Sequence, residues 1–174
     1  MKDDFAAAVA AEGDDAEIRA VLEEVCRVTG MGFAAVARVT EDRWIAAQVL
    51  DRIGFGLDAG DELAIKTTIC DDIRRSGEAV FIDYVGADPA WRSHPIPTLY
   101  GFQSYASIPI TLADGRFYGT LCAIDPEPRA VKPAETVAAL RALAGRVARA
   151  LSGTVGEGGR QPPPIQSPAK SFPA

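Results

Sequence analysis

Few side chains in this sequence could carry out chemistry: three cysteines, Cys26, Cys70 and Cys122, and a single histidine, His94. A thiol becomes a nucleophile when it ionises, and the start of a helix favours the thiolate. Cys70 falls in the first turn of a predicted helix, so it is the candidate reactive thiol, with a plain buried residue as the alternative. One histidine provides no His-based metal cluster, and we assemble no Ser-His-Asp triad around it. We therefore expect a protein that is not an enzyme.

The composition indicates one globular domain with a full core. The chain has 174 residues and a formal net charge of −6, with no basic cluster. That balance argues against nucleic acid and against an anionic membrane as partners. No apolar run approaches the roughly 20 residues of a membrane span, and the N-terminus has no signal-peptide core. Three scattered cysteines argue against a disulfide framework or a zinc site, so we expect a cytoplasmic protein.

The clearest structural signal is the stretch 103–125, which indicates two strands joined by a tight turn. Asp114-Gly115 supplies the positive φ angles that a two-residue hairpin turn requires. Counting outward separates an apolar face, which we expect helices to cover, from a mixed face, which we expect to line a pocket. The apolar pairs are Leu112–Phe117, Ile110–Gly119, Ile108–Leu121 and Ala106–Ala123, and the mixed pairs are Thr111–Tyr118, Pro109–Thr120, Ser107–Cys122 and Tyr105–Ile124.

The remaining patterns predict an α+β domain with a central antiparallel sheet of about five to six strands. Apolar residues spaced three and four apart predict a helix at 133–151 and one that starts near Asp14 or Asp15 and ends at residue 29. Asp14 and Glu17 resemble a capping box at the start of that first helix. Residues 1–13 are expected to be a frayed or partly helical lead-in, and the Gly/Pro-rich residues 152–174 a disordered tail. Further expected elements are strands at 33–40, 44–50 and 79–83, a flap at 51–60, and a helix at 66–76 capped by Thr67 or Thr68.

The segment from Tyr84 to Phe102 is the most unusual part of the sequence, because it combines three prolines with several aromatic rings. A long loop inside a compact domain is usually functional or disordered, and the rings argue against disorder. Pro97 is expected in the first turn of a short helix that ends at Tyr100. The loop covers either a ligand or simply the mixed face of the sheet, and both interpretations stay open.

Two motifs in this order of elements resemble the GAF domain family: Ser104-Tyr105-Ala106-Ser107-Ile108-Pro109-Ile110, and the run from Gly115 to Asp125. The segments 100–105 and 76–79 add to the resemblance, which covers residues 14–151 and is nearest to GAF modules of bacterial histidine kinases. It implies a GAF/PAS-like sheet with the terminal helices on one face and a small-molecule pocket on the other. It also implies homodimers through the terminal helices, and it does not identify a ligand.

The pocket that this resemblance implies would be mostly apolar with a few polar anchors. Its candidate residues are Tyr105, Ser107, Thr120 and Cys122 from the sheet, Trp91, His94, Tyr100 and Phe102 from the loop, and Cys70 and Asp71 from the helix. Covalent attachment of a bilin is not expected, because the loop contains no cysteine and the residue before His94 is Ser93. A non-covalent tetrapyrrole contacted by His94 and a bound nucleotide both stay open.

The expected function is that of a small-molecule-binding sensory module in bacterial signal transduction. It would relay the occupancy of its pocket through the terminal helices to a histidine kinase or another output protein. One alternative is a ligand-free dimerisation or scaffold module whose aromatic loop fills its own pocket. The other is a thiol-dependent reductase of free methionine sulfoxide using Cys70 and Cys122, although the cysteine arrangement of that enzyme is not visible here.

Overall fold

The structure is a computed structural model that describes residues 2–160. Its centre is one antiparallel sheet of six strands in the order β3-β2-β1-β6-β5-β4, which confirms the expected fold class. The short β3 was not predicted, because two residues carry no alternating pattern. The strands are β1 (Phe33–Val39), β2 (Trp44–Asp51), β3 (Glu62–Leu63), β4 (Val80–Ile82), β5 (Ser104–Thr111) and β6 (Phe117–Asp125).

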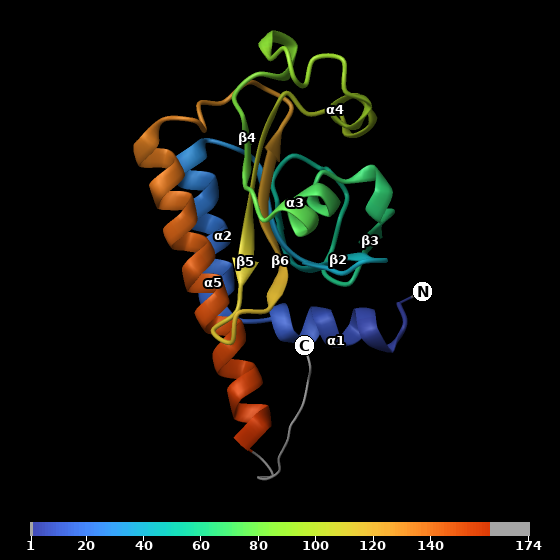
Figure 1. The fold of residues 1–174 in the computed structure, drawn as a ribbon, viewed down its shortest axis with the longest axis vertical. Helices are drawn as coiled ribbons and strands as arrows, with labels where there is room; N and C mark the ends of the chain where they lie inside the picture. Colours follow the sequence, from blue (N-terminus) through green and yellow to red (C-terminus); the bar gives the residue numbers. More distant parts are fainter. Residues whose placement is uncertain (1, 161–174) are drawn as a thin grey trace.

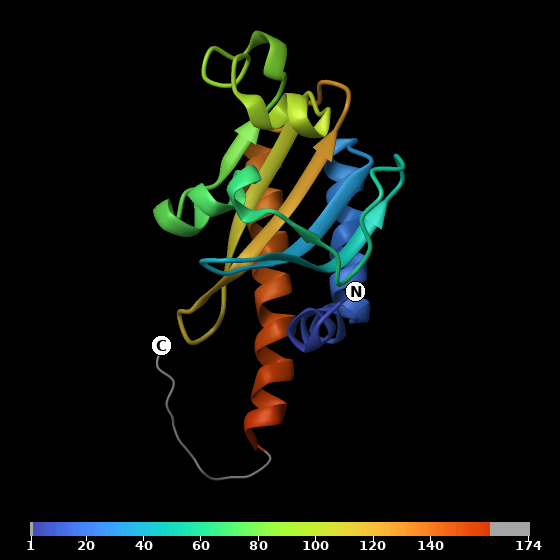
Figure 2. The same cartoon turned by 90° about the vertical axis from the view of Figure 1, so that its right-hand side faces the viewer.

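Helices cover the two faces of this sheet unequally (Figure 1). The long helices α2 (Ala16–Thr29) and α5 (Ala134–Arg160) lie side by side on one face, and α1 (Asp4–Gly13) runs crosswise from the lower end of α2. The short helices α3 (Cys70–Ser76) and α4 (Pro95–Tyr100) lie on the other side. Figure 2 shows that α5 continues beyond the end of the sheet. Among the described residues no helix is both long enough and apolar enough to span a membrane.

The helix-covered face forms the larger core. Helix α2 begins at Asp15, whose carboxylate accepts the N–H groups of Glu17 and Ile18 at 2.8 and 3.1 Å, and it ends at Gly30 in the left-handed conformation. The cap is therefore Asp15, one of the two expected starts, and not Asp14 of the capping box. Its apolar stripe meets that of α5 over the sheet. Fully buried members of this core include Ile18, Leu22, Ile110, Leu121 and Leu140.

Both ends of the domain are more helical than the sequence indicated. The expected lead-in 1–13 is largely the regular helix α1, capped by Asp3 and anchored by the fully buried Ala6 and Val9. The expected helix end near 151 is wrong as well, because α5 continues to Arg160. The predicted disordered tail therefore does not begin at residue 152, and its remainder, 161–174, lies outside the described residues.

The inner register of the β5–β6 hairpin is as predicted, from Tyr105 opposite Ile124 to Ile110 opposite Gly119. Near the turn the prediction is wrong. The loop has three residues, 113–115, closed by N–H bonds from Leu112 to Arg116 O (2.8 Å) and from Gly115 to Leu112 O (2.9 Å). A bulge next to Ile110 absorbs the extra residue. It turns Tyr118 to the helix side and places Phe117 with the cluster on the other face.

The predicted helix 66–76 is two pieces in the structure. A 3-10 turn at Ile65–Thr67 is followed by extended backbone at Thr68, and α3 begins only at Cys70. Neither Thr67 nor Thr68 caps α3, since their hydroxyls donate instead to Ala64 O and Ile65 O. The break leaves Cys70 as the first helical residue, facing the sheet.

Candidate functional site

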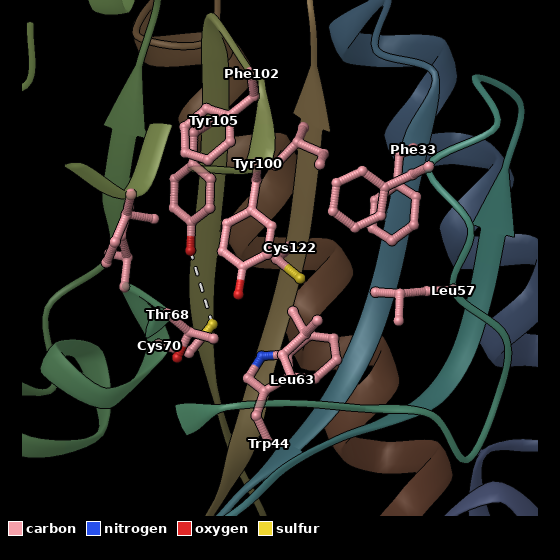
Figure 3. Close-up of a pocket in the computed structure, with 14 residues that line it drawn as sticks. Phe33, Trp44, Leu57, Leu63, Thr68, Cys70, Tyr100, Phe102, Tyr105 and Cys122 are labelled. Atoms are coloured by element: carbon pink, nitrogen blue, oxygen red, sulfur yellow. Dashed lines mark hydrogen bonds between the residues drawn. The ribbon is translucent and has the colours of Figure 1, made fainter. Parts of the chain in front are cut away.

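A cavity of about 50 Å³ lies on the face of the sheet opposite the long helices. Figure 3 shows its lining side chains, which come from the sheet, the flap, α3 and α4. The lining residues are Phe33, Trp44, Phe55, Leu57, Leu63, Thr68, Ile69, Cys70, Ile96, Tyr100, Phe102, Tyr105, Cys122 and Ile124. The cavity is thus enclosed by segments that are far apart in the sequence.

Aromatic rings fill most of the space around this cavity. The ring of Phe55, from the flap, lies 5.0 Å from Phe33 on β1 and 6.0 Å from Tyr100 on α4, measured between centroids. On β5 the Tyr105 ring is stacked on Phe102 at 5.2 Å. These spacings are typical of favourable ring pairs, so the flap and α4 close over the sheet through aromatic contacts.

None of the residues that line the cavity in the described part of the chain carries a charged side chain. The polar lining groups are hydroxyls, thiols and the indole N–H of Trp44. Tyr100 OH lies 2.6 Å from Thr67 Oγ1, and Thr68 Oγ1 donates to Ile65 O at 2.8 Å. Burial raises the pKa of Tyr105 well above its ordinary value, so this phenol is neutral at physiological pH. The cavity is an uncharged, largely apolar space.

Five of the ten predicted site residues line this cavity: Cys70, Tyr100, Phe102, Tyr105 and Cys122. Ser107 and Thr120 are fully buried next to Cys70, so they contact a lining residue without lining the cavity themselves. The face assignment of the hairpin placed its four members, Tyr105, Ser107, Thr120 and Cys122, on the correct side of the sheet.

The other three predicted residues lie away from the cavity lining. Asp71 is buried, and its carboxylate forms ion pairs with Arg74 at 3.1 Å, Arg75 at 3.7 Å and Lys66 at 3.9 Å. The rings of Trp91 and His94 contact each other at 4.8 Å between centroids.

His94 is occupied by its own helix rather than by the cavity. Its Nδ1 accepts the N–H of Ile96 at 3.2 Å, so His94 is the N-cap of α4. Pro95 follows as the first helical residue, which its fixed φ suits. The short helix predicted up to Tyr100 is present, and its cap uses Nδ1 of the histidine that was considered as a tetrapyrrole contact.

Several lining residues were missed in the sequence. Phe33, Trp44 and Ile124 lie on strands whose period-two pattern assigns them to the pocket face, so that signal was present. Phe55 and Leu57 belong to the predicted flap, where two apolar residues among glycines also pointed to a covered surface. Leu63, Ile69 and Ile96 had no comparable signal, because their positions depend on the turns around them.

The two thiols of the cavity form a polar cluster with neighbouring hydroxyls. Cys70 Sγ lies 3.2 Å from Thr120 Oγ1, 3.7 Å from Tyr105 OH and 3.9 Å from Ser107 Oγ. The Cys122 thiol, which donates to Ala35 O at 3.7 Å, is the neighbour that most lowers the pKa of Cys70 from its ordinary value; burial opposes the shift, and Thr120 adds to it. Cys70, together with burial, raises the pKa of Cys122.

Metal chemistry finds no support in the described residues. They contain no group of three or more His, Cys, Asp or Glu side chains placed to hold a metal ion. Cys26, the third cysteine, is buried in the core on the opposite face of the sheet, where burial raises the pKa of its thiol.

Comparisons with known proteins agree with the architecture. A comparison with curated protein sequences finds no match. Among solved structures, the GAF domain of a two-component sensor histidine kinase from Bacillus halodurans superposes with a TM-score of 0.62 at 12% identity, covering 82% of this chain and 95% of that one. The GAF-B domain of DevS from Mycobacterium smegmatis gives 0.59 at 16% identity, covering 81% and 94%.

A third similar structure is an enzyme. The type II free methionine-R-sulfoxide reductase from Thermoplasma acidophilum superposes with a TM-score of 0.60 at 12% identity, covering 83% of this chain and 96% of that chain. Identities this low show a shared fold only. The family model of the GAF domain matches residues 15–151, which is most of the sequence. This chain therefore belongs to the GAF domain family.

Proposed function

We propose that this GAF domain is a sensory module that binds a small, uncharged, apolar molecule between the sheet and the covering flap, α3 and α4. The observation that carries the proposal is the convergence of rings from separate segments on one cavity without a charged lining residue. Ligand sites are concave and mostly apolar, with a few polar groups that set orientation. The similarity to a sensor histidine kinase module supports a role in signalling.

The absence of charged side chains among the described lining residues discriminates between the ligand classes considered from the sequence. An anion or cation buried without a partner loses several kcal/mol or more of hydration that apolar walls do not replace. The carboxylates of a tetrapyrrole, the phosphate of a nucleotide and the zwitterion of free methionine sulfoxide would all lack a counter-charge on the cavity wall. This weighs against all three, and therefore against the reductase alternative.

The size of the cavity requires it to open. Typical ligand pockets hold roughly 300–1,000 Å³, whereas this cavity measures about 50 Å³. The side chains of Phe55 and Leu57 in the flap and Tyr100 in α4 line the cavity and pack against the buried cluster on this face. Binding would displace them, and they belong to surface segments rather than to the sheet.

The sheet offers a physical route from the pocket to the helices. Tyr105 and Cys122 face the cavity, while their neighbours Ala106 and Leu121 face the long helices. We propose that movement of the flap and α4 on binding shifts α2 and α5, which pack against each other beneath the sheet. In a homodimer formed through these helices, the shift would reach a histidine kinase or another output protein.

The ligand-free scaffold remains a second candidate because of the same small cavity. If the rings of Phe55, Tyr100 and Phe102 are the permanent filling of the pocket, the domain needs no ligand and serves dimerisation alone. The two candidates differ in one measurable property, which is whether the small cavity widens to admit a molecule of the right chemistry.

The deciding experiment measures thermal shifts and native mass spectra of the full chain with matched ligand pairs: indole against indole-3-carboxylate, and naphthalene against 1-naphthoate. We expect stabilisation by the neutral member of each pair. Leu63→Trp, which fills the cavity from β3, should abolish it, whereas Leu99→Trp on the exposed side of α4 should not. Absence of binding by all four compounds, and of any copurified molecule, would favour the scaffold.

A further inference from the structure

Two thiols from different elements meet on the pocket face of the sheet, and the ligand-binding proposal uses neither of them. Cys70 is the first residue of α3, and Cys122 lies in the middle of β6. Both are free and buried, and both line the cavity. Figure 3 shows both side chains on the pocket face of the sheet, with the Cys70 sulfur joined to the Tyr105 hydroxyl by a dashed line.

The contacts of the Cys70 sulfur place it over the part of the sheet that surrounds Cys122. Ser107, whose Oγ is 3.9 Å from this sulfur, is the cross-strand partner of Cys122. Thr120, whose Oγ1 is 3.2 Å away, is two residues before Cys122 on the same face of β6. Side chains at such positions are nearest neighbours on a sheet surface. The two thiols are therefore adjacent.

The surroundings of Cys70 favour its ionised form. The neighbouring Cys122 thiol, the Thr120 hydroxyl, the Trp44 indole and the Tyr105 hydroxyl lower the pKa of Cys70 against the effect of burial. A Cys70 thiolate in turn raises the pKa of Cys122. The pair thus consists of one thiolate and a neighbouring protonated thiol, which is the arrangement of an attacking and a resolving cysteine.

We propose that Cys70 and Cys122 form an intramolecular disulfide in response to hydrogen peroxide. The Cys70 thiolate attacks one peroxide oxygen, the O–O bond breaks, and hydroxide leaves, so that Cys70 becomes a sulfenic acid. The Cys122 sulfur loses its proton to that hydroxide and attacks the Cys70 sulfur, and a second hydroxide leaves and is protonated. Two thiols and one peroxide give one disulfide and two water molecules.

The cavity provides the access that the buried sulfurs otherwise lack. Its volume of about 50 Å³ exceeds the roughly 10–15 Å³ that one water molecule requires in such a measure. Peroxide has about the size of two waters and can use the same hydroxyl partners. The bridge would tie the first turn of α3 to β6, across the wall of the cavity. Formation of this disulfide does not depend on the proposed ligand, so an experiment that refutes one proposal leaves the other intact.

The sequence makes the test direct, because trypsin places the three cysteines on separate peptides, 20–27, 67–74 and 117–129. The full chain is reduced, freed of reductant, treated with equimolar peroxide, denatured, alkylated and digested. We expect the intact mass to fall by about 2 Da before alkylation, a linked pair of peptides holding Cys70 and Cys122, and Cys26 fully alkylated.

Three matched variants separate the roles. In Cys122→Ala, dimedone should trap a sulfenic acid at Cys70, because no resolving thiol remains. In Cys70→Ala, and equally in Cys70→Ser should the alanine variant not fold, Cys122 should stay reduced at the same dose. Cys26→Ala should form the bridge as the wild type does, since Cys26 lies on the other face of the sheet. A bridge that involves Cys26, a link between two chains, or unchanged thiols in a protein with native circular dichroism would overturn the proposal.

Discussion

The carboxylate of Asp51 accepts the backbone N–H of Gly56 at 2.8 Å, which ties the end of β2 to the middle of the flap. The same side chain accepts the N–H groups of Ile53 at 3.1 Å and Phe55 at 3.0 Å. Gly56 adopts a φ of 99°, which only glycine tolerates without strain. One carboxylate therefore orders the segment that carries Phe55 and Leu57 into the cavity.

Replacing this carboxylate should loosen the flap without unfolding the sheet. Asp51→Ala leaves three N–H groups to water, and we expect a loss of about 1–2 kcal/mol in the free energy of unfolding. Amide hydrogen exchange at residues 53–57 should accelerate by more than tenfold. The control is Asp58→Ala, an exposed residue of the same loop. Equal exchange rates in both variants would show that Asp51 does not hold the flap.

The same carboxylate predicts a pH dependence. Burial acts to raise the pKa of Asp51, but the N–H groups of Gly56, Phe55 and Ile53 outweigh it and hold the pKa below 3.8. A lowered pKa contributes stability that is complete above pH 3.8 and is lost as the pH falls through the folded value. The difference in unfolding free energy between wild type and Asp51→Ala should therefore shrink from pH 5 to pH 3. A difference that is constant or grows over that range would contradict it.

Phe102 tests whether the rings fill a pocket that can accept a ligand. Its side chain is buried and stacked on Tyr105, so Phe102→Ala should cost about 3–5 kcal/mol and enlarge the cavity. Indole should then return part of that stability in urea titrations, because it binds only the folded state. Phe5→Ala, at a ring that is 40% exposed on α1, should cost under about 1 kcal/mol and gain nothing from indole. Equal responses of the two variants would show that no such pocket exists.

The sequence predicted the sheet faces because that information is local and periodic. Ser107 and Cys122 face each other as expected, since alternation along both strands allows only one inner register. The Asp114-Gly115 pair was a correct turn signal with the wrong loop length. Type I turns with a left-handed glycine and two-residue turns share this signature, and the bulge that distinguishes them here depends on the packing of Tyr118.

Site residues were predictable where they lie on strands and less so elsewhere. The pocket-facing positions of Cys122 and Tyr105 were predicted from the two-residue alternation of side chains along a strand. Asp71 was wrongly assigned to the pocket, because the prediction placed it on a single helix that starts at residue 66. The break at Thr68 depends on hydrogen bonds of its hydroxyl and backbone to Ile65. His94 was assigned to the pocket, but a neighbouring proline made it a helix cap. Such local competition among hydrogen bonds leaves no periodic trace in the sequence.

Gly119 provides the sharpest test of the packing at the centre of the sheet. It pairs with both Arg38 on β1 and Ile110 on β5, and a Cβ atom there would lie 1.8 Å from the carbonyl oxygen of Ala37. The obstacle is backbone of a central strand, which has no rotamer that could move aside. Gly119→Ala should therefore lose more than about 3 kcal/mol of stability, the upper range for overpacking.

The matched control makes the same substitution where space allows it. Gly145 lies inside α5, and a Cβ atom there would meet only the end of the Arg149 side chain at 3.6 Å, an ordinary contact. Gly145→Ala should raise the free energy of unfolding by about 0.5–1 kcal/mol, because alanine favours a helix interior. In urea unfolding we therefore expect the free energy of unfolding to fall for Gly119→Ala and to rise for Gly145→Ala, because only Gly119 lies against the backbone of a neighbouring strand. A Gly119→Ala protein as stable as the wild type would mean that β1 and β6 approach each other less closely than this structure places them.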